Sequence, residues 1–191
     1  MGAGYNEEQL AGLLMHLGRA AYTGDPRDDL SPAQRMCLRY FCRANRFSRT
    51  VSGFADFHAT TRGTASLTVA GLVERGLLRR HPSRLDGRSR RLDLTERGRE
   101  LVNDSLSPLE EAVKQLPRTH RALLGATLDR LTRDLAKARG SATFGTCGQC
   151  VYFSEGPAVT NVASRSRCNL FGEPLNAEDV ETICLNFKAA G

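Results

Sequence analysis

The sequence has few of the features that mark membrane, secreted or enzymatic proteins. No apolar run approaches the roughly 20 residues that span a bilayer. Residues 1–9 lack the basic segment, followed by an apolar stretch, of a secretory signal. There is no Ser-His-Asp set, phosphate-binding loop or catalytic pair of acids, and His58, His81 and His120 have no evident partner. We therefore expect a cytoplasmic protein that is not an enzyme.

The length and composition bound the architecture. The 191 residues suffice for one domain of ordinary size, with or without a small appendage, and a hydrophobic content of 40% supports a real core. Cytoplasmic thiols stay reduced. Four clustered cysteines near the C-terminus are therefore better explained as metal ligands than as two disulfides.

Positive charge is concentrated in one block of the chain. The net charge is +6, but residues 31–100 carry fifteen Arg against six acidic residues, whereas residues 1–30 and 141–191 are net acidic. Arg suits bidentate contacts to phosphate and guanine better than Lys does. The block therefore favours nucleic acid as a partner, although a solvated basic surface in an Arg-rich chain would look the same.

Apolar periodicity and capping residues predict a chain of helices. Asn6 and Ser31 are suitable N-caps, and Pro32 suits a first helical position. The expected helices cover residues 6–22, 31–44, 96–106 and 118–139, the third with a restart at Pro108. Cys37 and Cys42 lie five residues apart on the second helix, a spacing that suits two metal ligands poorly, so we expect buried apolar residues there.

Two short helices at residues 50–58 and 60–75, joined by a tight turn, predict a helix-turn-helix. The second helix is rich in hydroxyl groups in its N-terminal half and apolar in its C-terminal half. This pattern indicates a recognition helix whose N-terminus enters the major groove. Its candidate DNA contacts are Thr60, Thr61, Arg62, Thr64, Ser66, Leu67 and Thr68.

A β-hairpin is predicted directly after this helix. Residues 77–81 and 90–95 read as strands, and Asp86-Gly87 between them is a strong hairpin signal. Arginines on such a narrow ribbon suit the minor groove, where the negative potential is strongest. The candidate contacts of this wing are Arg84, Asp86, Arg88 and Arg90.

Residues 6–138 resemble the MarR family of winged-helix regulators. The matching segments are residues 30–34, residues 63–66, residues 72–78 and, most specifically, residues 86–98 of the wing. The resemblance implies that Arg88 lies in the minor groove and that Asp86 orients it. It also implies a homodimer in which the first and last helices of two subunits interleave. Such a dimer reads a palindromic operator with half-sites about 34 Å apart.

Four cysteines stand in the last fifty residues: Cys147, Cys150, Cys168 and Cys184. Four thiolates at this spacing are typical of a metal centre. The loop-rich tail buries too little apolar surface to fold alone, so a metal is expected to hold it together. Apolar residues beside each cysteine favour an iron–sulfur cluster. The single Cys-x-x-Cys pair is less typical of zinc, but structural zinc and redox thiols or disulfides remain alternatives.

The tail is also similar to the ligand pattern of high-potential iron–sulfur proteins. The similarity rests on residues 147–153, residues 167–172 and residues 184–187. It implies one [4Fe-4S] cluster held by the four cysteines. Those proteins are exported electron carriers and usually place Gly-Trp before the last cysteine, where this chain has Thr182-Ile183 and no tryptophan at all.

We therefore predict a mainly α fold with a small β-wing. The expected divisions are an N-terminal dimerisation helix (1–30), a winged helix-turn-helix domain (31–95), C-terminal dimerisation helices (96–140) and a cysteine-rich iron–sulfur or zinc domain (141–191). The predicted function is a homodimeric, sequence-specific DNA-binding transcriptional regulator. Its cluster would sense redox state, iron or nitric oxide through packing of the tail against the dimerisation helices.

Two alternatives remain at the level of sequence. One is a MarR-like repressor that responds to a small organic ligand and carries a purely structural zinc tail. The other is an electron-transfer or redox protein whose winged helix does not bind DNA.

Overall fold

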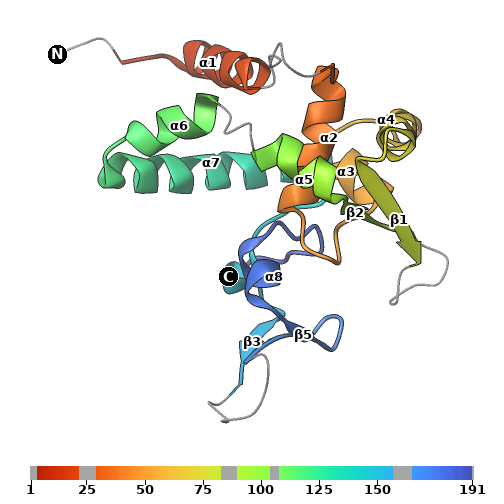
Figure 1. The fold of residues 1–191 in the computed structure, drawn as a ribbon. Coiled ribbons are helices and arrows are strands. Elements are labelled where there is room, and N and C mark those ends of the chain that lie inside the picture. Colours follow the sequence, from red (N-terminus) through yellow and green to blue (C-terminus); the bar gives the residue numbers. More distant parts are fainter. Residues whose placement is uncertain (1–3, 22–28, 83–89, 104–107, 157–164, 191) are drawn as a thin grey trace.

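The computed structural model is mainly helical and contains two small antiparallel sheets (Figure 1). It describes residues 4–21, 29–82, 90–103, 108–156 and 165–190. The helices are α1 (Glu7–Ala20), α2 (Pro32–Arg43), α3 (Val51–Phe57), α4 (Arg62–Glu74), α5 (Glu96–Asn103), α6 (Pro108–Gln115), α7 (Arg118–Arg139) and α8 (Ala177–Glu181). The strands are β1 (Leu78–Pro82), β2 (Arg90–Leu94), β3 (Phe153–Glu155), β4 (Ser166–Cys168) and β5 (Glu173–Leu175), and η1 (Cys147–Gln149) is a short 3-10 helix. The predicted fold class is confirmed.

The helices begin where the capping residues predict. Asn6 and Ser31 each form a capping box, in which their side chains accept from the third helical backbone N–H. Thr50 caps α3 and Thr61 caps α4 through their hydroxyl groups. Each cap satisfies a backbone donor that has no partner within its helix. These local bonds place α3 and α4 as consecutive short helices, as a helix-turn-helix requires.

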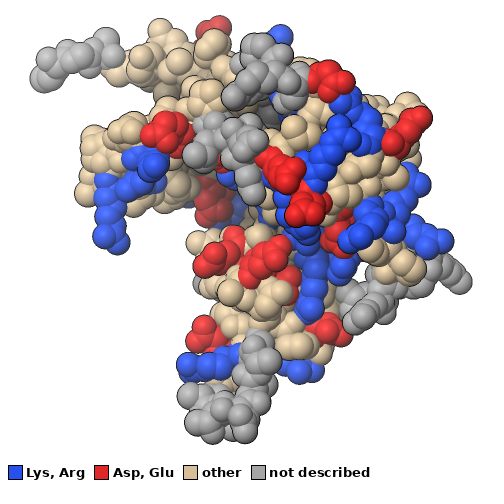
Figure 2. Space-filling model, in the orientation of Figure 1, with Lys and Arg blue, Asp and Glu red and all other residues tan. Residues whose placement is uncertain are grey.

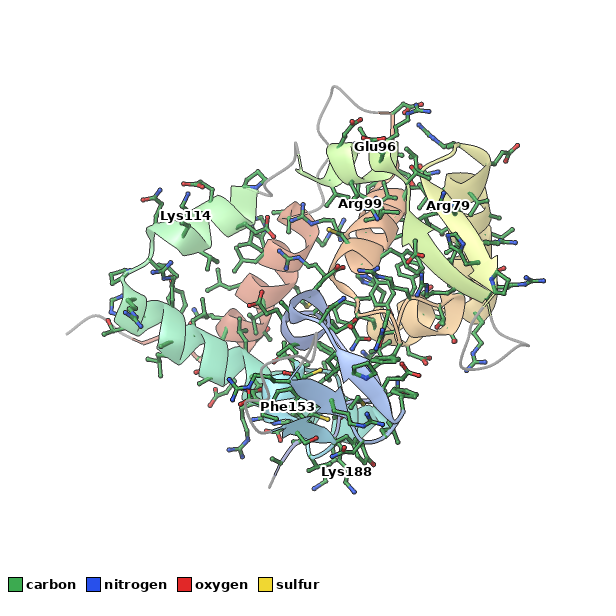
Figure 3. All side chains as sticks on the ribbon, turned by 60° about the horizontal axis from the view of Figure 1, so that its bottom comes forward. Arg79, Glu96, Arg99, Lys114, Phe153 and Lys188 are labelled. Carbon is green, nitrogen blue, oxygen red and sulfur yellow. The ribbon has the colours of Figure 1, made fainter. Side chains whose placement is uncertain are left out.

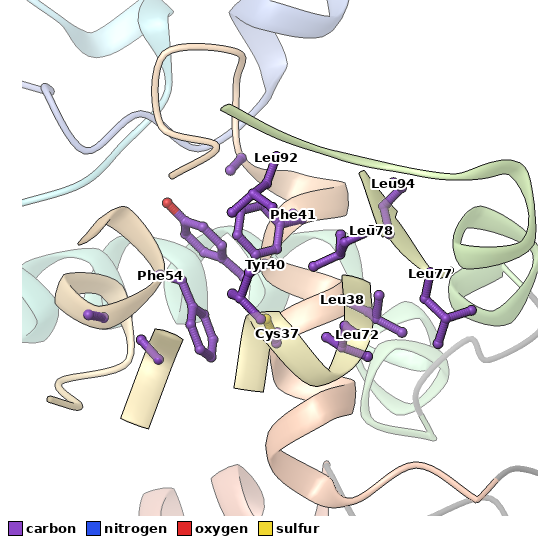
Figure 4. Close-up of a cluster of buried hydrophobic side chains, with 14 of the residues drawn as sticks. Cys37, Leu38, Tyr40, Phe41, Phe54, Leu72, Leu77, Leu78, Leu92 and Leu94 are labelled. Carbon is purple, nitrogen blue, oxygen red and sulfur yellow. The ribbon is translucent and has the colours of Figure 1, made fainter. Parts of the chain in front are cut away.

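The hydrophobic core is built around α2. Figure 4 shows Tyr40 and Phe41 of this helix between Phe54 on one side and the leucines of α4 and the wing on the other. The predicted burial of the two cysteines on α2 holds: Cys37 is fully buried, and Cys42 is half-buried against the same core. The core therefore fixes α4 and the wing relative to α2.

The wing follows α4 directly. Strands β1 and β2 pair antiparallel, with Leu78 opposite Leu94 and Pro82 opposite Arg90. The first strand begins one residue later than predicted. Leu92 and Leu94 are buried and face the core, so one face of the ribbon anchors the wing. The predicted hairpin turn lies outside the described residues.

Helices α1, α6 and α7 lie together on the side opposite the wing (Figure 1). No residue of α1 is buried, and Ala136 alone is buried among the residues of α7. Both helices nevertheless carry rows of exposed leucine side chains. No helix in the described part of the chain combines the length and apolarity that a membrane span needs.

The tail is more regular than predicted. The sequence predicts a loop-rich tail, but β3, β4 and β5 form a three-stranded antiparallel sheet. Each strand has three residues, too few for an alternating pattern to stand out in the sequence. The tail also contains α8, which Asn176 caps with a capping box and which ends at Glu181.

Candidate metal centre and nucleic-acid interface

The four cysteines of the tail line a single small cavity. The rest of its wall is mostly apolar and aromatic. The other lining residues are Asn45, Phe47, Tyr152, Phe153, Leu170, Phe171, Leu175 and Asn186. The structure therefore brings together four predicted ligands from widely separated positions.

Short-range backbone bonds position each thiol. The 3-10 turn of η1 has a bond of 2.9 Å from the N–H of Cys150 to the carbonyl oxygen of Cys147, which turns the first two cysteines toward one side. Cys168 ends β4 opposite Phe153. Cys184 exchanges two backbone bonds with Gly145, of 2.9 and 3.2 Å. A Cβ at Gly145 would lie 2.8 Å from the Phe187 ring, so this close approach requires glycine.

Burial and the neighbouring thiols raise the pKa of two of the four cysteines, Cys147 and Cys184. Burial raises the pKa of Cys147 to about 11, and the other three cysteines and Asp179 add to the effect. Burial also raises the pKa of Cys184, although the Asn45 side chain, the Asn186 backbone and the Ser48 side chain act in the opposite direction. A bound cation would reverse this balance, because metal binding displaces thiol protons.

The next question is which metal group the four thiols could bind. In the described residues, no group of three or more Cys, His, Asp or Glu side chains is placed to hold a single metal ion. A tetrahedral zinc site needs four ligands that converge within about 2.3 Å of one point. Four cysteines that line one cavity are a ligand set used both by structural zinc and by an iron–sulfur cluster whose iron atoms are each bound by a different cysteine. All six cysteines are free thiols.

The apolar shell agrees in part with the one that the sequence predicts. Tyr152, Phe153, Leu170 and Phe171 line the cavity, but Val151 is exposed. The residues that flank Cys184 have other roles. Leu185 packs against the winged-helix core, and the Phe187 ring lies against Gly145.

Sequence reasoning missed the part of the wall that the winged helix contributes. Asn45 and Phe47 belong to the loop between α2 and α3, residues 44–50, which we call the α2–α3 loop. No motif or spacing marks them in the sequence. The opposite charges of the basic block and the acidic tail were the only available signal that these two parts associate.

Backbone bonds join the tail to the α2–α3 loop. The N–H of Asn45 donates to the carbonyl oxygen of Ile183 at 2.8 Å, and the N–H of Ile183 donates to that of Arg43 at 2.7 Å. One residue beyond Cys184, the Leu185 N–H donates to the hydroxyl of Ser48 at 2.9 Å. The last cysteine is therefore held directly against the winged helix.

Ion pairs strengthen the same junction. Arg46 pairs with Asp179 at 3.4 Å and Glu173 at 3.8 Å, and Arg49 pairs with Glu178 of α8. Figure 2 shows acidic side chains of the molecule's middle part beside the basic side chains that extend toward the wing. In Figure 3 the tail, with Phe153 and Lys188, lies apart from Lys114 of α6 and from Arg79 of the wing.

The tail therefore contacts the winged helix directly, in addition to the dimerisation helices that the sequence predicts as its partner. The start of the tail also borders α7, in an open groove lined by Ala122, Ala126 and Phe144 among others. Phe144 also packs against Phe57 of α3, with ring centroids 4.5 Å apart. Contacts with a predicted dimerisation helix thus exist beside those with the α2–α3 loop.

The N-terminal half of α4 presents its polar residues to solvent. Thr61, Arg62, Thr64, Ser66 and Leu67 are exposed, and Leu67 is 78% exposed. Thr60 and Thr68 are half-exposed, whereas Ala65, Val69 and Leu72 face the core.

Some of these hydroxyl groups already have partners within the helix. Thr61 accepts from the Thr64 N–H at 3.1 Å as the cap, and the Thr68 hydroxyl donates to the Thr64 carbonyl oxygen at 3.0 Å. Arg62, Ser66 and Leu67 therefore remain the side chains best placed to contact a partner.

The wing presents arginines around one buried acid. Asp93 is 8% exposed and accepts from Arg91 at 2.7 Å, and Arg49 lies 3.4 Å from its other oxygen. Burial alone would raise the pKa of Asp93, but the two arginines outweigh it and hold this pKa below its usual value. Arg90 is exposed at the start of β2. The candidates Arg84, Asp86 and Arg88 lie outside the described residues.

Comparisons with known proteins agree with this fold. Residues 28–89 match the sequence model of the MarR family. The structure is similar to S. aureus MepR in its complex with DNA, with a TM-score of 0.54 and 22% identity over 69% of this chain and 99% of that one. It is also similar to a MarR transcriptional regulator from Methanosarcina mazei Go1, with a TM-score of 0.56 and 19% identity over 69% of this chain and 99% of that one.

A third similar structure is MarR itself, with a TM-score of 0.53 and 24% identity over 72% of this chain and 99% of that one. A comparison with curated proteins finds no match. The class of fold is thus a winged helix of the MarR type. Nearly all of each solved structure is matched, while more than a quarter of this chain has no counterpart in them.

Proposed function

We propose that this chain is a homodimeric, DNA-binding transcriptional regulator whose tail binds an iron–sulfur cluster and whose DNA affinity depends on that cluster. The observation that carries the proposal is the cavity that all four tail cysteines share with Asn45 and Phe47 of the winged helix. A metal centre in this cavity would be a structural part of the DNA-binding fold.

DNA binding is supported by the exposed surface of α4 and by the basic block around it. The N-terminus of α4 offers Arg62, Ser66 and Leu67 to a groove, and the wing adds Arg90. The similar structure of MepR is a complex with DNA. Phosphate contacts from the arginines would make this binding strongly dependent on salt.

Dimerisation is supported by the apolar surfaces of α1 and α7. Four leucines of α1 (Leu10, Leu13, Leu14 and Leu17) and four of α7 (Leu123, Leu128, Leu131 and Leu135) are at least 37% exposed. Contiguous apolar surface of this kind marks an interaction site. A second copy of this chain is the occupant that a two-fold DNA reader requires.

The cluster is assigned to Cys147, Cys150, Cys168 and Cys184, with [4Fe-4S] as the type that four cysteines hold. When bound, such a cluster supplies reversible one-electron chemistry and sensitivity to oxidants, iron supply and nitric oxide. The protein itself holds the four thiols in an apolar cavity, which limits access of water.

The α2–α3 loop is the proposed route from the cluster to DNA. Its wall residues border the cavity, and four residues after Asn45 the Arg49 carbonyl oxygen accepts from the Leu92 N–H of β2 at 2.8 Å. Oxidation or loss of the cluster would shift the loop and therefore the wing. A coupling of about 1–3 kcal/mol would change operator affinity by roughly 5–150-fold.

The test begins with anaerobic purification of the full chain, followed by iron and sulfide assays and an absorption spectrum. DNA that the wild-type holo protein selects from a random pool then serves to compare the wild type with Cys168→Ser. We expect the variant to lack the cluster and to bind this DNA with changed affinity. Cys42→Ser, which alters a half-buried thiol outside the cavity, is the control. Identical affinities for holo wild type and apo Cys168→Ser would refute the sensing role.

The same preparation separates the alternatives. Zinc without iron would favour a structural zinc tail in a regulator that responds to a small organic ligand. Failure to bind any DNA at low salt, where phosphate contacts are strongest, would favour an electron-transfer protein.

A further inference from the structure

Asn45 is the one polar side chain that the winged helix contributes to the wall of the four-cysteine cavity in the described structure. It is 1% exposed. Its backbone N–H bonds the carbonyl oxygen of Ile183, the residue before Cys184. Asn45 is therefore fixed beside the last cysteine by a bond that does not involve its side chain.

The two ends of the Asn45 amide differ in their partners. Oδ1 accepts from the N–H groups of Phe47 at 3.2 Å and Ser48 at 3.1 Å, and these bonds shape the α2–α3 loop. Nδ2 is buried and makes no hydrogen bond of ordinary geometry within the described residues, but the Asn45 side chain interacts with the Cys184 thiol and lowers its pKa. A buried donor without a partner costs about 1–3 kcal/mol. The turn needs only the oxygen, so the amide nitrogen is left to interact with sulfur in the cavity, where Cys184 is its neighbour.

We propose that Nδ2 of Asn45 donates a hydrogen bond to a sulfur atom of the metal centre in this cavity, so that the DNA-binding fold itself contacts that centre. The inference rests on the proposed function, because it requires a thiolate-bound metal group. Thiolates and cluster sulfides are acceptors, and a neutral amide supplies a donor without adding charge.

This contact has two physical consequences. Hydrogen bonds to sulfur stabilise the more electron-rich state, so they raise the reduction potential of an iron–sulfur cluster. The bond is correspondingly stronger in the reduced state. The same loop carries Arg49, whose side chain reaches both Asp93 of the wing and Glu178 of α8. A change in the hydrogen bond at Asn45 would therefore alter the α2–α3 loop, which contacts the wing through Arg49 and Asp93.

Two variants distinguish the role of the Nδ2 donor from the role of Oδ1 in shaping the α2–α3 loop. Asn45→Asp keeps an oxygen for the Phe47 and Ser48 N–H groups but replaces the donor with a second oxygen. Asn45→Ser is neutral, and its hydroxyl accepts from the same turn. Asn186→Asp is the matched control, because it places the same negative charge at the same cavity from an exposed residue of the tail.

The experiment uses full-length protein purified anaerobically. The reduction potential, the iron and sulfide content and the rate of cluster loss in air are measured for each variant. We expect both Asn45 variants to have a lower potential than the wild type and to lose the cluster about tenfold faster. Asn186→Asp is expected to have a smaller effect than Asn45→Asp. Circular dichroism establishes that each variant is folded.

The outcomes are distinguishable from those of the proposed function. Folded Asn45 variants with wild-type potential and cluster lifetime would overturn this inference and leave the proposed function standing. Equal effects of Asn45→Asp and Asn186→Asp, with none from Asn45→Ser, would show a charge effect only and would also overturn it. A wild type without any metal would overturn both. If the wild type holds zinc, the cluster proposal fails, and a tenfold loss of zinc affinity in Asn45→Ser supports the donor role whereas an unchanged affinity overturns it.

Discussion

The ring of Phe47 in the α2–α3 loop stacks on the ring of Phe171 in the tail, with centroids 4.5 Å apart and planes within 13° of parallel. Both rings line the four-cysteine cavity. The guanidinium of Arg46 lies 4.8 Å from the Phe47 ring centroid. The stacked pair thus closes the wall of the cavity at the place where the tail meets the winged helix.

We expect the two phenylalanines to be energetically coupled. Phe47→Ala and Phe171→Ala should each destabilise the protein, and the double variant should lose about 0.5–1.5 kcal/mol less than the sum of the two. Denaturant unfolding of the four proteins measures this coupling. Phe57→Ala combined with Phe171→Ala is the control pair, because Phe57 packs on Phe144 instead. Additive effects in the first cycle would show that the stacking contributes nothing to the junction.

Arg49 is predicted to connect the tail to the wing. Its guanidinium is largely buried, donates to the Ala44 carbonyl oxygen at 2.8 Å and pairs with Asp93 and Glu178. Arg49→Gln should lower the free energy of unfolding by about 2 kcal/mol. It should also make the DNA affinity depend less on the metal centre, so the affinities measured with and without that centre should differ less than in the wild type.

The matched control is Arg130→Gln on α7. Arg130 makes an exposed pair with Asp134 at 2.9 Å, and such pairs contribute about 0.3–0.5 kcal/mol. An affinity ratio that is unchanged in Arg49→Gln would exclude this arginine from the coupling.

His58 should make the protein less stable in mild acid. Burial among the rings of Tyr40, Phe54 and Phe57 lowers the pKa of His58 from 6.5 to about 4, and its Nε2 has no partner within the described residues. Between these values the unfolded chain binds a proton that the folded chain does not. Stability is therefore lost as the pH falls from 6.5 toward 4, by an amount on the order of 1 kcal/mol at pH 5 after allowance for partial exposure.

His58→Gln removes the titrating imidazole, so the variant measures how much stability other groups lose between pH 7 and pH 5. Urea unfolding at pH 7 and pH 5 should show a smaller loss of stability in the variant than in the wild type. An equal loss in both would mean that His58 is protonated in the folded protein.

Leu131→Lys should dissociate the proposed dimer. Leu131 is 47% exposed on the apolar face of α7, and a charge there would be left without a partner in an interface. Sedimentation velocity is expected to show a dimer for the wild type and a monomer for the variant. Thr119→Lys, at an exposed polar position of the same helix, should remain dimeric. A monomeric wild type at micromolar concentration would rule out the dimer.

Arg62→Ala should weaken binding to all DNA sequences and reduce the salt slope by about 1, because it removes one cation from the N-terminus of the recognition helix. Arg88→Ala, at the wing position that sequence alone assigns, should do the same more strongly. Fluorescence anisotropy at several salt concentrations measures both. Arg130→Ala removes an equal charge from α7 and should change the slope little. Unchanged binding in Arg88→Ala would mean that the wing assignment is wrong.

The sequence alone determined those parts of the molecule that depend on local interactions. Asn6, Ser31 and Thr61 cap their helices through bonds to residues three positions later, so a short stretch of sequence suffices to place each start. The apolar positions of α2 and α4 repeat at helical spacing, and the hairpin pairs strands that are near in sequence. The four cysteines could be recognised as a set because metal ligands are restricted to few residue types.

Only the tertiary structure decided what surrounds those cysteines. Asn45 and Phe47 enter the cavity wall through the backbone bond to Ile183 and the ring contact with Phe171, and neither contact leaves a periodic or spacing signal in the chain. The three-residue strands of the tail could not be predicted from the sequence either, because they are strands through their pairing with one another and not through a local pattern. Long-range packing alone placed the tail on the winged helix, because the contacts that hold it there join residues that are far apart in the sequence.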